Sequence, residues 1–465
     1  MSITVTIGEK EYFPEVKKIQ YEGDSSDNPL SFKYYDADRL VDGKPMKDHL
    51  RFATAYWHTF CGKGNDPFGP GTKVYPWDNP NDPVHSAHQR LDAAFEFFTK
   101  LGTEFFCFHD RDLSPEGTNV QETNDLLKNF TSLTKRKQQE SGVRLLWGTA
   151  NLFSHPRYMN GAATNPDFNV VAYAGSQVKS ALDATIKLGG ENYVFWGGRE
   201  GYNSLLNTDM KREMDHLAMF LSQARDYGRE NGFSGTFLIE PKPMEPSKHQ
   251  YDFDVAAVAS FLKQYELDND FKINIENNHA TLAGHTFDHE IQAAYNYGLF
   301  GSLDINQGDP HNGWDTDEFL HNIYDAVHIM MVLLENGGLG SGGMNFDAKT
   351  RRNSTDLEDI FIGHINSMDT LARGLLIASN ILKDSSYLKL KSNRYSSFDN
   401  GDGHSFEKGE VNLKKLAELA QNSSEPDQIM QNSALFCTMG SFVPNACKIC
   451  QQVRIQTINN DKSHM

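Results

Sequence analysis

The sequence has few cysteines, an excess of acidic over basic residues and no long apolar run. Five cysteines in 465 residues are too few for the disulfide framework of a secreted protein. Lys and Arg number 44 against 62 Asp and Glu, a formal net charge of −18, which argues against nucleic-acid or anionic-membrane partners. The longest apolar run, near residues 329–334, is far shorter than the ~20 residues that cross a bilayer. The first residues also lack the pattern of a signal peptide, so we expect a protein of the reducing cytoplasm.

The cysteines divide into two groups. Cys61 and Cys107 lie among apolar residues, and we expect both to be buried thiols. Cys437, Cys447 and Cys450 lie close together near the carboxyl end, and the C-x-x-C spacing is one half of many zinc sites. No second half with suitable spacing follows, so the tail from about residue 425 is interpreted as divergent or disordered rather than as a zinc site.

A glycine-rich phosphate loop after an early strand is also missing, which counts against an open doubly wound sheet. Instead, short apolar runs alternate with amphipathic stretches such as 87–101, 208–227 and 255–265, which have helical periodicity. The runs are Leu50–Trp57, Phe105–Phe108, Leu145–Thr149, Tyr193–Trp196, Thr236–Ile239, Lys272–Ile275, Leu299–Leu303 and Gly343–Phe346. Eight strand–helix units predict an α/β fold, a (β/α)8 TIM barrel.

The predicted organisation has three parts. Residues 1–45 are polar and rich in turns, and they predict an N-terminal arm. Residues 46–375 form the barrel, and residues 376–465 contain helical stretches without strands. We interpret this last part as a C-terminal helical extension that packs on another subunit.

Acidic residues end the last four predicted strands, where the strands of a barrel place their functional groups. Together with nearby residues they give seven candidate metal ligands: Glu240, Glu276, His279, Asp304, Asp315, Asp317 and Asp347. So many carboxylates cannot gather without cations, and the set suits two divalent ions, with Glu276 able to bridge them. Oxygen ligands with one imidazole favour Mg, Mn or Co over zinc. The alternative is a series of unrelated surface acids or helix caps.

Three further residues are candidates for catalysis. His109 ends the second strand, and Asp112 can hold one of its ring nitrogens while the other acts as a base, unless the pair is only structural. Lys242 lies two residues after Glu240, where it can donate to a substrate oxygen or form a salt bridge with the same acids.

Aromatic residues would form the wall of the pocket. Trp57, Trp196 and Phe68 are candidates for an apolar surface that excludes water, although tryptophan is more often a core residue. Thr149 ends the third strand and faces the same end of the barrel.

Longer motifs make the chain resemble xylose isomerase, of the longer type with an N-terminal extension. The motifs, within about Tyr34 to Leu419, are Phe108–Gly117, Leu238–Pro243, Asn278–Phe287, Gly313–Glu318 and Asn345–Asp359. The resemblance implies a homotetramer that converts D-xylose to D-xylulose, and D-glucose to D-fructose less well. Asn277 and the run Asn306–Asp309 depart from the usual pattern, and neither departure falls on a predicted ligand.

The resemblance also implies roles for the candidate residues. One metal would be held by Glu240, Glu276, Asp304 and Asp347, and a second by Glu276, His279, Asp315 and Asp317. His109 with Asp112 would assist opening of the sugar ring, and Lys242 would bind the oxygen on the first carbon. Trp57, Trp196 and Thr149 would line the pocket, and Phe68 would reach into the site of a neighbouring subunit.

Three rival functions remain open. A metal-dependent nuclease or hydrolase would need more histidine ligands and a basic groove, and both are missing. A non-catalytic sugar-binding protein would be expected to lack a ligand, whereas every expected position is filled. Another metal-dependent aldose–ketose isomerase on the same barrel is the nearest alternative.

Overall fold

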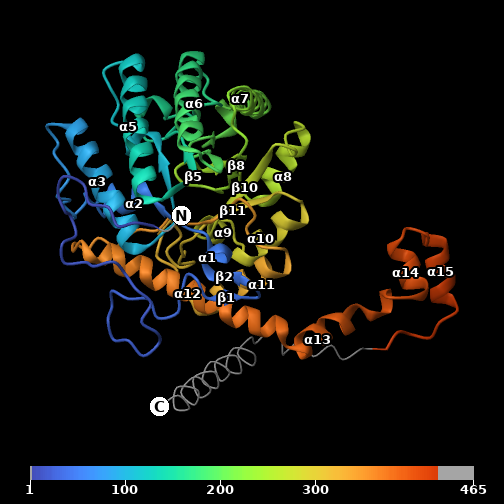
Figure 1. The fold of residues 1–465 in the computed structure, drawn as a ribbon. Helices are drawn as coiled ribbons and strands as arrows, with labels where there is room; N and C mark the ends of the chain where they lie inside the picture. The colour runs from blue at the N-terminus through green and yellow to red at the C-terminus, as the bar shows by residue number, and fades with distance from the viewer. Residues whose placement is uncertain (1–2, 67, 428–465) are drawn as a thin grey trace, which may run out of the picture. The chain divides into compact units, whose positions relative to one another are not determined.

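The computed structural model describes residues 3–66 and 68–427, and its centre is a closed barrel of parallel strands (Figure 1). The barrel strands are β3 (Phe52–Ala55), β4 (Phe105–His109), β5 (Arg144–Thr149), β6 (Asn192–Trp196), β8 (Thr236–Glu240), β10 (Phe271–Glu276), β11 (Phe300–Asp304) and β12 (Met344–Phe346). They follow the ring in chain order, and β12 pairs with β3 to close it. Each of the eight predicted runs contributes one strand, which confirms the (β/α)8 fold.

The first strand is shorter than predicted. Only Phe52–Ala55 is extended, because Leu50 ends helix α1 (Met46–Leu50) and Arg51 adopts a left-handed φ of 40°. After Ala55 the chain turns directly into helix α2 (Tyr56–Phe60). Trp57 therefore lies in a helix just beyond the strand rather than at the strand end.

Helices surround the strands, and their ends follow ordinary capping chemistry (Figure 1). Asp82, Asn119 and Asp167 accept backbone hydrogen bonds at the starts of α3, α5 and α6, and glycines with positive φ end the same three helices. The helices in the barrel region are α3 (Pro83–Leu101), α4 (Asp110–Leu113), α5 (Val120–Ser141), α6 (Phe168–Leu188), α7 (Met210–Glu230), α8 (Val255–Gln264), α9 (Asn277–Leu282), α10 (Phe287–Asn296), α11 (Ile323–Glu335) and α12 (Glu358–Lys383).

Short elements fill the connections. They are the strand pairs β1 (Leu40–Val41) with β2 (Lys44–Pro45) and β7 (Gly201–Tyr202) with β9 (His249–Gln250), and the 3₁₀ turns η1 (Pro156–Tyr158), η2 (Leu205–Asn207) and η3 (Ser396–Phe398).

The barrel interior is packed with buried side chains from several strands. A buried cluster contains Ala53, Phe105, Cys107, Leu146, Trp147, Val194 and Leu238, and Trp57 packs against it. Cys107 is therefore a buried thiol as expected. Cys61 is only half-buried, and Nη1 of Arg90 lies 2.9 Å from its Sγ.

The N-terminal segment contacts the barrel helices through apolar side chains. Phe13 is buried and packs against Trp77, Phe97 and Phe361. The Glu96 carboxylate on α3 accepts hydrogen bonds from the backbone N–H groups of Tyr12 and Phe13, at 2.7 and 2.9 Å. The predicted arm thus supplies core aromatics as well as polar surface.

The chain separates into two compact units between Arg373 and Gly374, within α12. The second unit contains α13 (Ser385–Tyr395), α14 (Gly401–Glu407) and α15 (Leu413–Gln421). Its proposed contact with another subunit stays a prediction, and Cys437, Cys447 and Cys450 lie outside the described residues. Across residues 3–66 and 68–427, no helix combines the length and the apolar character that a bilayer span requires.

Candidate metal centre

Four carboxylates meet at the carboxyl ends of consecutive strands. Glu240, Glu276 and Asp304 are the last residues of β8, β10 and β11, and Asp347 directly follows β12. Each offers a ligand oxygen, and these oxygens all lie within 4.8 Å of one another. Glu276 and Asp304 are paired in the sheet register, so strand pairing itself brings the acids together.

A second group of ligands adjoins the first. His279 lies on α9, immediately after β10, and its Nε2 is 3.0 Å from Oε2 of Glu276 and 3.2 Å from Oδ2 of Asp315. Asp315 and Asp317 come from the loop between β11 and α11, and their carboxylates cluster with Glu276. Glu276 therefore belongs to both groups. All seven predicted ligands lie in one centre.

Burial makes this concentration of negative charge unfavourable in the absence of a cation. Burial, followed by repulsion from neighbouring carboxylates, raises the pKa of Glu240 and Glu276 well above the usual range. The same causes raise the pKa of Asp304 to about 8. A bound cation would favour the ionised forms and reverse these shifts.

The residues fit divalent ions in their donor atoms as well as in their charge. Nδ1 of His279 and Oδ1 of Asp315 are buried, and neither has a hydrogen-bond partner among the described residues. Buried polar atoms without partners are costly, so these atoms are available to a ligand that the protein alone does not supply. Oxygen-rich ligation with one imidazole suits Mg²⁺, Mn²⁺ or Co²⁺.

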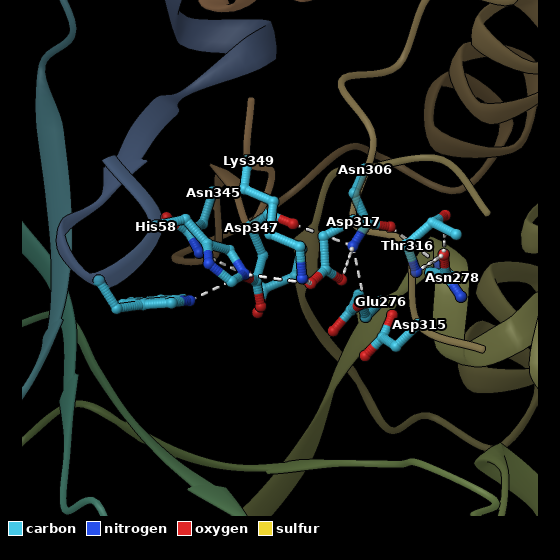
Figure 2. A network of polar contacts seen from close by, with 12 residues as sticks. His58, Glu276, Asn278, Asn306, Asp315, Thr316, Asp317, Asn345, Asp347 and Lys349 are labelled. Atoms are coloured by element: carbon cyan, nitrogen blue, oxygen red, sulfur yellow. Dashed lines mark hydrogen bonds and ion pairs between the residues drawn. The ribbon is translucent and has the colours of Figure 1, made fainter. Parts of the chain in front are cut away.

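Two basic residues that the sequence analysis missed contact the acids (Figure 2). Nε2 of His58 lies 2.9 Å from Asp347 and 3.2 Å from Asp317, and Nζ of Lys349 lies 2.6 Å from Asp317. Burial would raise the pKa of Asp317, but Lys349 and His58 hold it well below the usual range. Burial opposes protonation of His58, yet the two aspartates raise its pKa to about 9. In the sequence, the one indication of their role is their position: His58 follows Trp57, and Lys349 lies two residues after Asp347.

Three buried asparagines support the carboxylates from the barrel interior. Nδ2 of Asn274 donates to Glu240 and Asp304, both at 2.9 Å, and Nδ2 of Asn345 donates to Asp304 at 2.9 Å. Nδ2 of Asn306 lies 2.6 Å from Oε1 of Glu276 and also faces Asp317 (Figure 2). Asn306, the first residue of the run that departs from the family pattern, therefore contacts two predicted ligands directly.

Lys242 points into the centre. Its Nζ lies 2.6 Å from Oδ2 of Asp315, 3.4 Å from Oε2 of Glu245 and 5.5 Å from the ring centroid of Trp196. Burial alone would lower the pKa of Lys242, but Asp315 and Glu276 raise it above the usual value. The lysine is thus a buried cation held by the acids, which is the salt bridge considered from the sequence.

His109 and Asp112 form the expected pair. Nδ1 of His109 lies 2.9 Å from Oδ2 of Asp112, so the carboxylate fixes the ring and leaves Nε2 for other partners. The Trp57 ring packs edge-on against His109 at 4.5 Å, and Phe153 lies 5.5 Å away on another side. The imidazole is therefore held by one carboxylate and two aromatic rings.

A cavity of about 150 Å³ separates His109 from the acids, a size that suits a small polar molecule. Its aromatic lining consists of Trp57, Trp147, Phe153 and Trp196. Thr149 also lines it, with its hydroxyl 2.5 Å from the carbonyl oxygen of Val194.

Phe68 is not part of this cavity. Its side chain is 80% exposed, and its ring packs edge-on against Trp314 at 6.0 Å. Both residues line a wider groove that shares Asp315 and Asp317 with the cavity. Within one chain, the predicted wall of Trp57, Trp196 and Phe68 is therefore incomplete, and Trp147 and Phe153 occupy the remaining side.

Two xylose isomerases are similar to this chain over nearly its whole length. It is 59% identical over 429 residues to xylose isomerase 2 of Xanthomonas campestris pv. campestris, covering 92% of this chain and 96% of that protein. It is 58% identical over 427 residues to a xylose isomerase of Bacteroides thetaiotaomicron, covering 92% of this chain and 98% of that protein. The family model "XylA2 C-terminal domain" matches residues 391–430, which extends the likeness past Leu419.

The solved structures that match the chain are much less similar in sequence. The 3-keto-D-glucoside 4-epimerase YcjR from E. coli has a TM-score of 0.46 and 13% identity, covering 70% of this chain and 98% of that one. L-ribulose 3-epimerase has a TM-score of 0.46 and 15% identity, and the match covers 64% of this chain and 93% of that one. The sequence relatives identify the protein: the chain belongs to the xylose isomerase family and is a sugar isomerase.

Proposed function

We propose that this enzyme converts D-xylose to D-xylulose, and D-glucose to D-fructose less well, by ring opening followed by a 1,2-hydride shift. The observation that carries the proposal is that Glu276 belongs to both groups of acids. The cavity beside it has a size that suits a sugar. That arrangement suits two adjacent divalent ions, Mg²⁺, Mn²⁺ or Co²⁺, in each subunit. When bound, the ions supply Lewis-acid polarisation of the oxygens on carbons 1 and 2 of the sugar.

Ring opening falls to His109 in this proposal. With Asp112 accepting from Nδ1–H, Nε2 holds the lone pair and can take the proton of the anomeric hydroxyl. Returning that proton to the ring oxygen breaks the ring carbon–oxygen bond and leaves an open aldose. Trp57 and Phe153 hold the imidazole in the orientation that this transfer requires.

Lys242 would donate from Nζ to the oxygen on carbon 1 of the open sugar. In the protein alone its partner is Asp315, a predicted metal ligand, so the ammonium already lies beside the metal centre. During isomerisation a hydride passes from carbon 2 to carbon 1 and a proton from oxygen 2 to oxygen 1. No external oxidant or reductant is needed.

The aromatic lining favours hydride movement. Trp57, Trp147, Phe153 and Trp196 give the cavity an apolar lining against which the sugar carbons would lie. Excluding water suppresses exchange of a carbon-bound hydrogen with solvent. A neutral sugar also needs no basic pocket, in keeping with the net charge of −18.

The proposal also includes the family type, the cellular location and the oligomeric state of the protein. We place the chain in the longer type of the family, with an N-terminal extension, in the cytoplasm. We expect a homotetramer in which Phe68, exposed in the single chain, enters the site of a neighbouring subunit. Light scattering in solution should then give four times the chain mass of 52.4 kDa.

A ketose-formation assay tests the proposal. The enzyme is treated with a chelator, dialysed, and supplied with D-xylose and with Mg²⁺, Mn²⁺ or Co²⁺ in turn. We expect no ketose without metal and activity restored by at least one ion. In deuterated water, the hydride shift predicts xylulose without deuterium at carbon 1, and deuterium at that carbon would reject the shift.

The nearest alternative is another metal-dependent aldose–ketose isomerase on the same barrel. A panel of aldopentoses and aldohexoses separates the two, because specificity is the ratio of kcat/KM values between substrates. A value for another aldose well above that for D-xylose would favour the alternative.

A further inference from the structure

A second group of metal-binding side chains lies away from the barrel centre. It contains His285, His289 and Glu290 around the start of α10, and Asp254 at the start of α8 contacts His285. Nε2 of His285 lies 3.3 Å from Oδ2 of Asp254 and 4.0 Å from Oε1 of Glu290. Nε2 of His289 lies 3.9 Å from the same Glu290 oxygen. None of these residues has a part in the proposed sugar chemistry.

The imidazoles of His285 and His289 both face the same carboxylate oxygen of Glu290. The side chain of Glu290 is only 4% exposed, and Oε2 accepts a 2.9 Å hydrogen bond from the backbone N–H of Val255. Within residues 3–66 and 68–427, no group donates a hydrogen bond to Oε1, since the imidazole nitrogens of His285 and His289 are too distant. Burial raises the pKa of this carboxyl. Oε1, the oxygen that faces both imidazoles, is therefore the atom of Glu290 that can reach a cation.

The spacing of the donors is close to that of a tetrahedral site. Zinc–nitrogen and zinc–oxygen bonds of about 2.0–2.1 Å place neighbouring ligand atoms about 3.3 Å apart. The separations here are 3.3, 3.9 and 4.0 Å. The rings of His285 and His289 are stacked with centroids 4.9 Å apart, and both are partly exposed. Small rotations of exposed imidazoles can therefore close the remaining distance.

We propose that His285, His289 and Glu290, together with Asp254, bind a zinc-type divalent ion at the surface of the barrel. Two imidazole nitrogens favour Zn²⁺ over Mg²⁺, in contrast to the oxygen-rich set at the strand ends. Two carboxylates offset the partial positive charge of the two helix starts. The ion would fasten α10 to the start of α8, just after α9, which carries His279.

Metal content measured in the presence of excess Mg²⁺ tests the site. Full-length enzyme is dialysed to equilibrium against saturating Mg²⁺ with micromolar Zn²⁺, and bound zinc is measured by mass spectrometry. We expect one Zn²⁺ per chain in the wild type and none in His285→Ala/His289→Ala. The matched control, His85→Ala/His311→Ala, also removes two exposed imidazoles and should retain the ion.

Glu290→Gln provides an independent variant that keeps an oxygen for Val255. It should bind Zn²⁺ at least about tenfold more weakly. Even the loss of a residue that only hydrogen-bonds to a metal ligand lowers metal affinity by about tenfold or more. Zn²⁺ should also raise the thermal unfolding midpoint of wild type and control but not of the double variant. Equal zinc content in wild type and His285→Ala/His289→Ala would overturn the proposal, as would a wild type that binds none.

Discussion

Nδ2 of Asn306 lies 2.6 Å from Oε1 of Glu276, the carboxylate that both groups of acids share. The same amide nitrogen faces Asp317 at 3.2 Å and the carbonyl oxygen of Asp347 at 2.9 Å. One buried amide therefore connects ligands from β10, from the loop after β11 and from the end of β12. It fixes the direction of Glu276, so it should affect metal binding without contacting the metals.

Asn306→Ala should lower the affinity for activating Mg²⁺ by about 10- to 100-fold, the usual effect of removing an outer partner of a metal ligand. The measurement is the Mg²⁺ concentration that gives half-maximal activity after chelation. Asn312→Ala, at an exposed position of the same loop, is the control and should behave as wild type. Equal Mg²⁺ requirements for the two variants would rule out the supporting role.

Glu276→Ala should reduce kcat/KM by more than about 10²-fold, because both proposed metals lose a ligand. The circular dichroism spectrum should stay unchanged, since the side chain lies at the end of its strand. Glu230→Ala, which removes an exposed carboxylate at the end of α7, should leave kcat/KM unaltered. Full activity in Glu276→Ala would contradict the two-metal assignment.

His109→Ala should slow ring opening by about 10²- to 10⁴-fold, the usual contribution of a positioned acid–base group. Exchange spectroscopy on the bound sugar measures ring opening separately from ketose formation. Asp112→Asn should reproduce part of the loss, because an amide no longer holds Nδ1–H as a carboxylate does. An unchanged opening rate in His109→Ala would remove the histidine from the mechanism.

Chelated enzyme should lose stability as the pH rises from about 6 to about 9. The folded pKa of Asp304 is about 8, above its ordinary value, so its stabilising contribution is complete at low pH and is lost as the pH rises through 8. His58, with its pKa raised to about 9, acts in the same direction. Thermal unfolding midpoints should therefore fall with pH without metal, and Mg²⁺ should flatten the trend.

Asp252 offers a control for this pH effect. Burial raises its pKa to about 8 as well, but it is not among the proposed metal ligands. Asp252→Asn should reduce the slope only in part and should preserve the response to Mg²⁺. Midpoints of the chelated enzyme that rise from pH 6 to 9 would show that the acids are not the dominant groups.

Phe68→Ala should lower kcat/KM by about tenfold if the ring completes the site of a neighbouring subunit. Leu206→Ala, which truncates a side chain that is 98% exposed, is the control and should have little effect. Mixing Phe68→Ala chains with Glu276→Ala chains should restore part of the activity, since the second variant supplies the missing ring to the intact centre of the first. No recovery in mixed tetramers would place Phe68 outside the partner's site.

Much of the barrel and of the acidic centre could be predicted from the sequence. Apolar runs followed by acids are sufficient, because parallel strands in a closed ring must place their carboxyl ends together. The error at the first strand arose because Leu50 and Trp57 continue the apolar pattern, whereas the backbone turns at Arg51 and Ala55. Periodicity does not detect such a turn.

The residues that the sequence analysis did not single out, or placed wrongly, differ in the reason. Asn274 and Asn345 are polar residues inside apolar strands, and such a position in the sequence indicates a buried polar contact. His58 and Lys349 follow known candidates closely, yet their contacts depend on side-chain directions that spacing does not determine. The position of Phe68 outside the cavity depends on how a long loop folds, and no local pattern specifies that.

The pairing of β3 with β12 determines when the centre can form during synthesis. Ala53 pairs with Asn345, and Nε1 of Trp57 donates to Asp347 at 2.8 Å, so partners from opposite ends of the barrel sequence must meet there. A nascent chain that has emerged only as far as Asp304 cannot complete the cage of acids, because Asp347 has yet to leave the ribosome. Such distant pairing forms late in folding. Metal capture therefore requires that the chain has emerged at least as far as Asp347, so that β12 can close the ring.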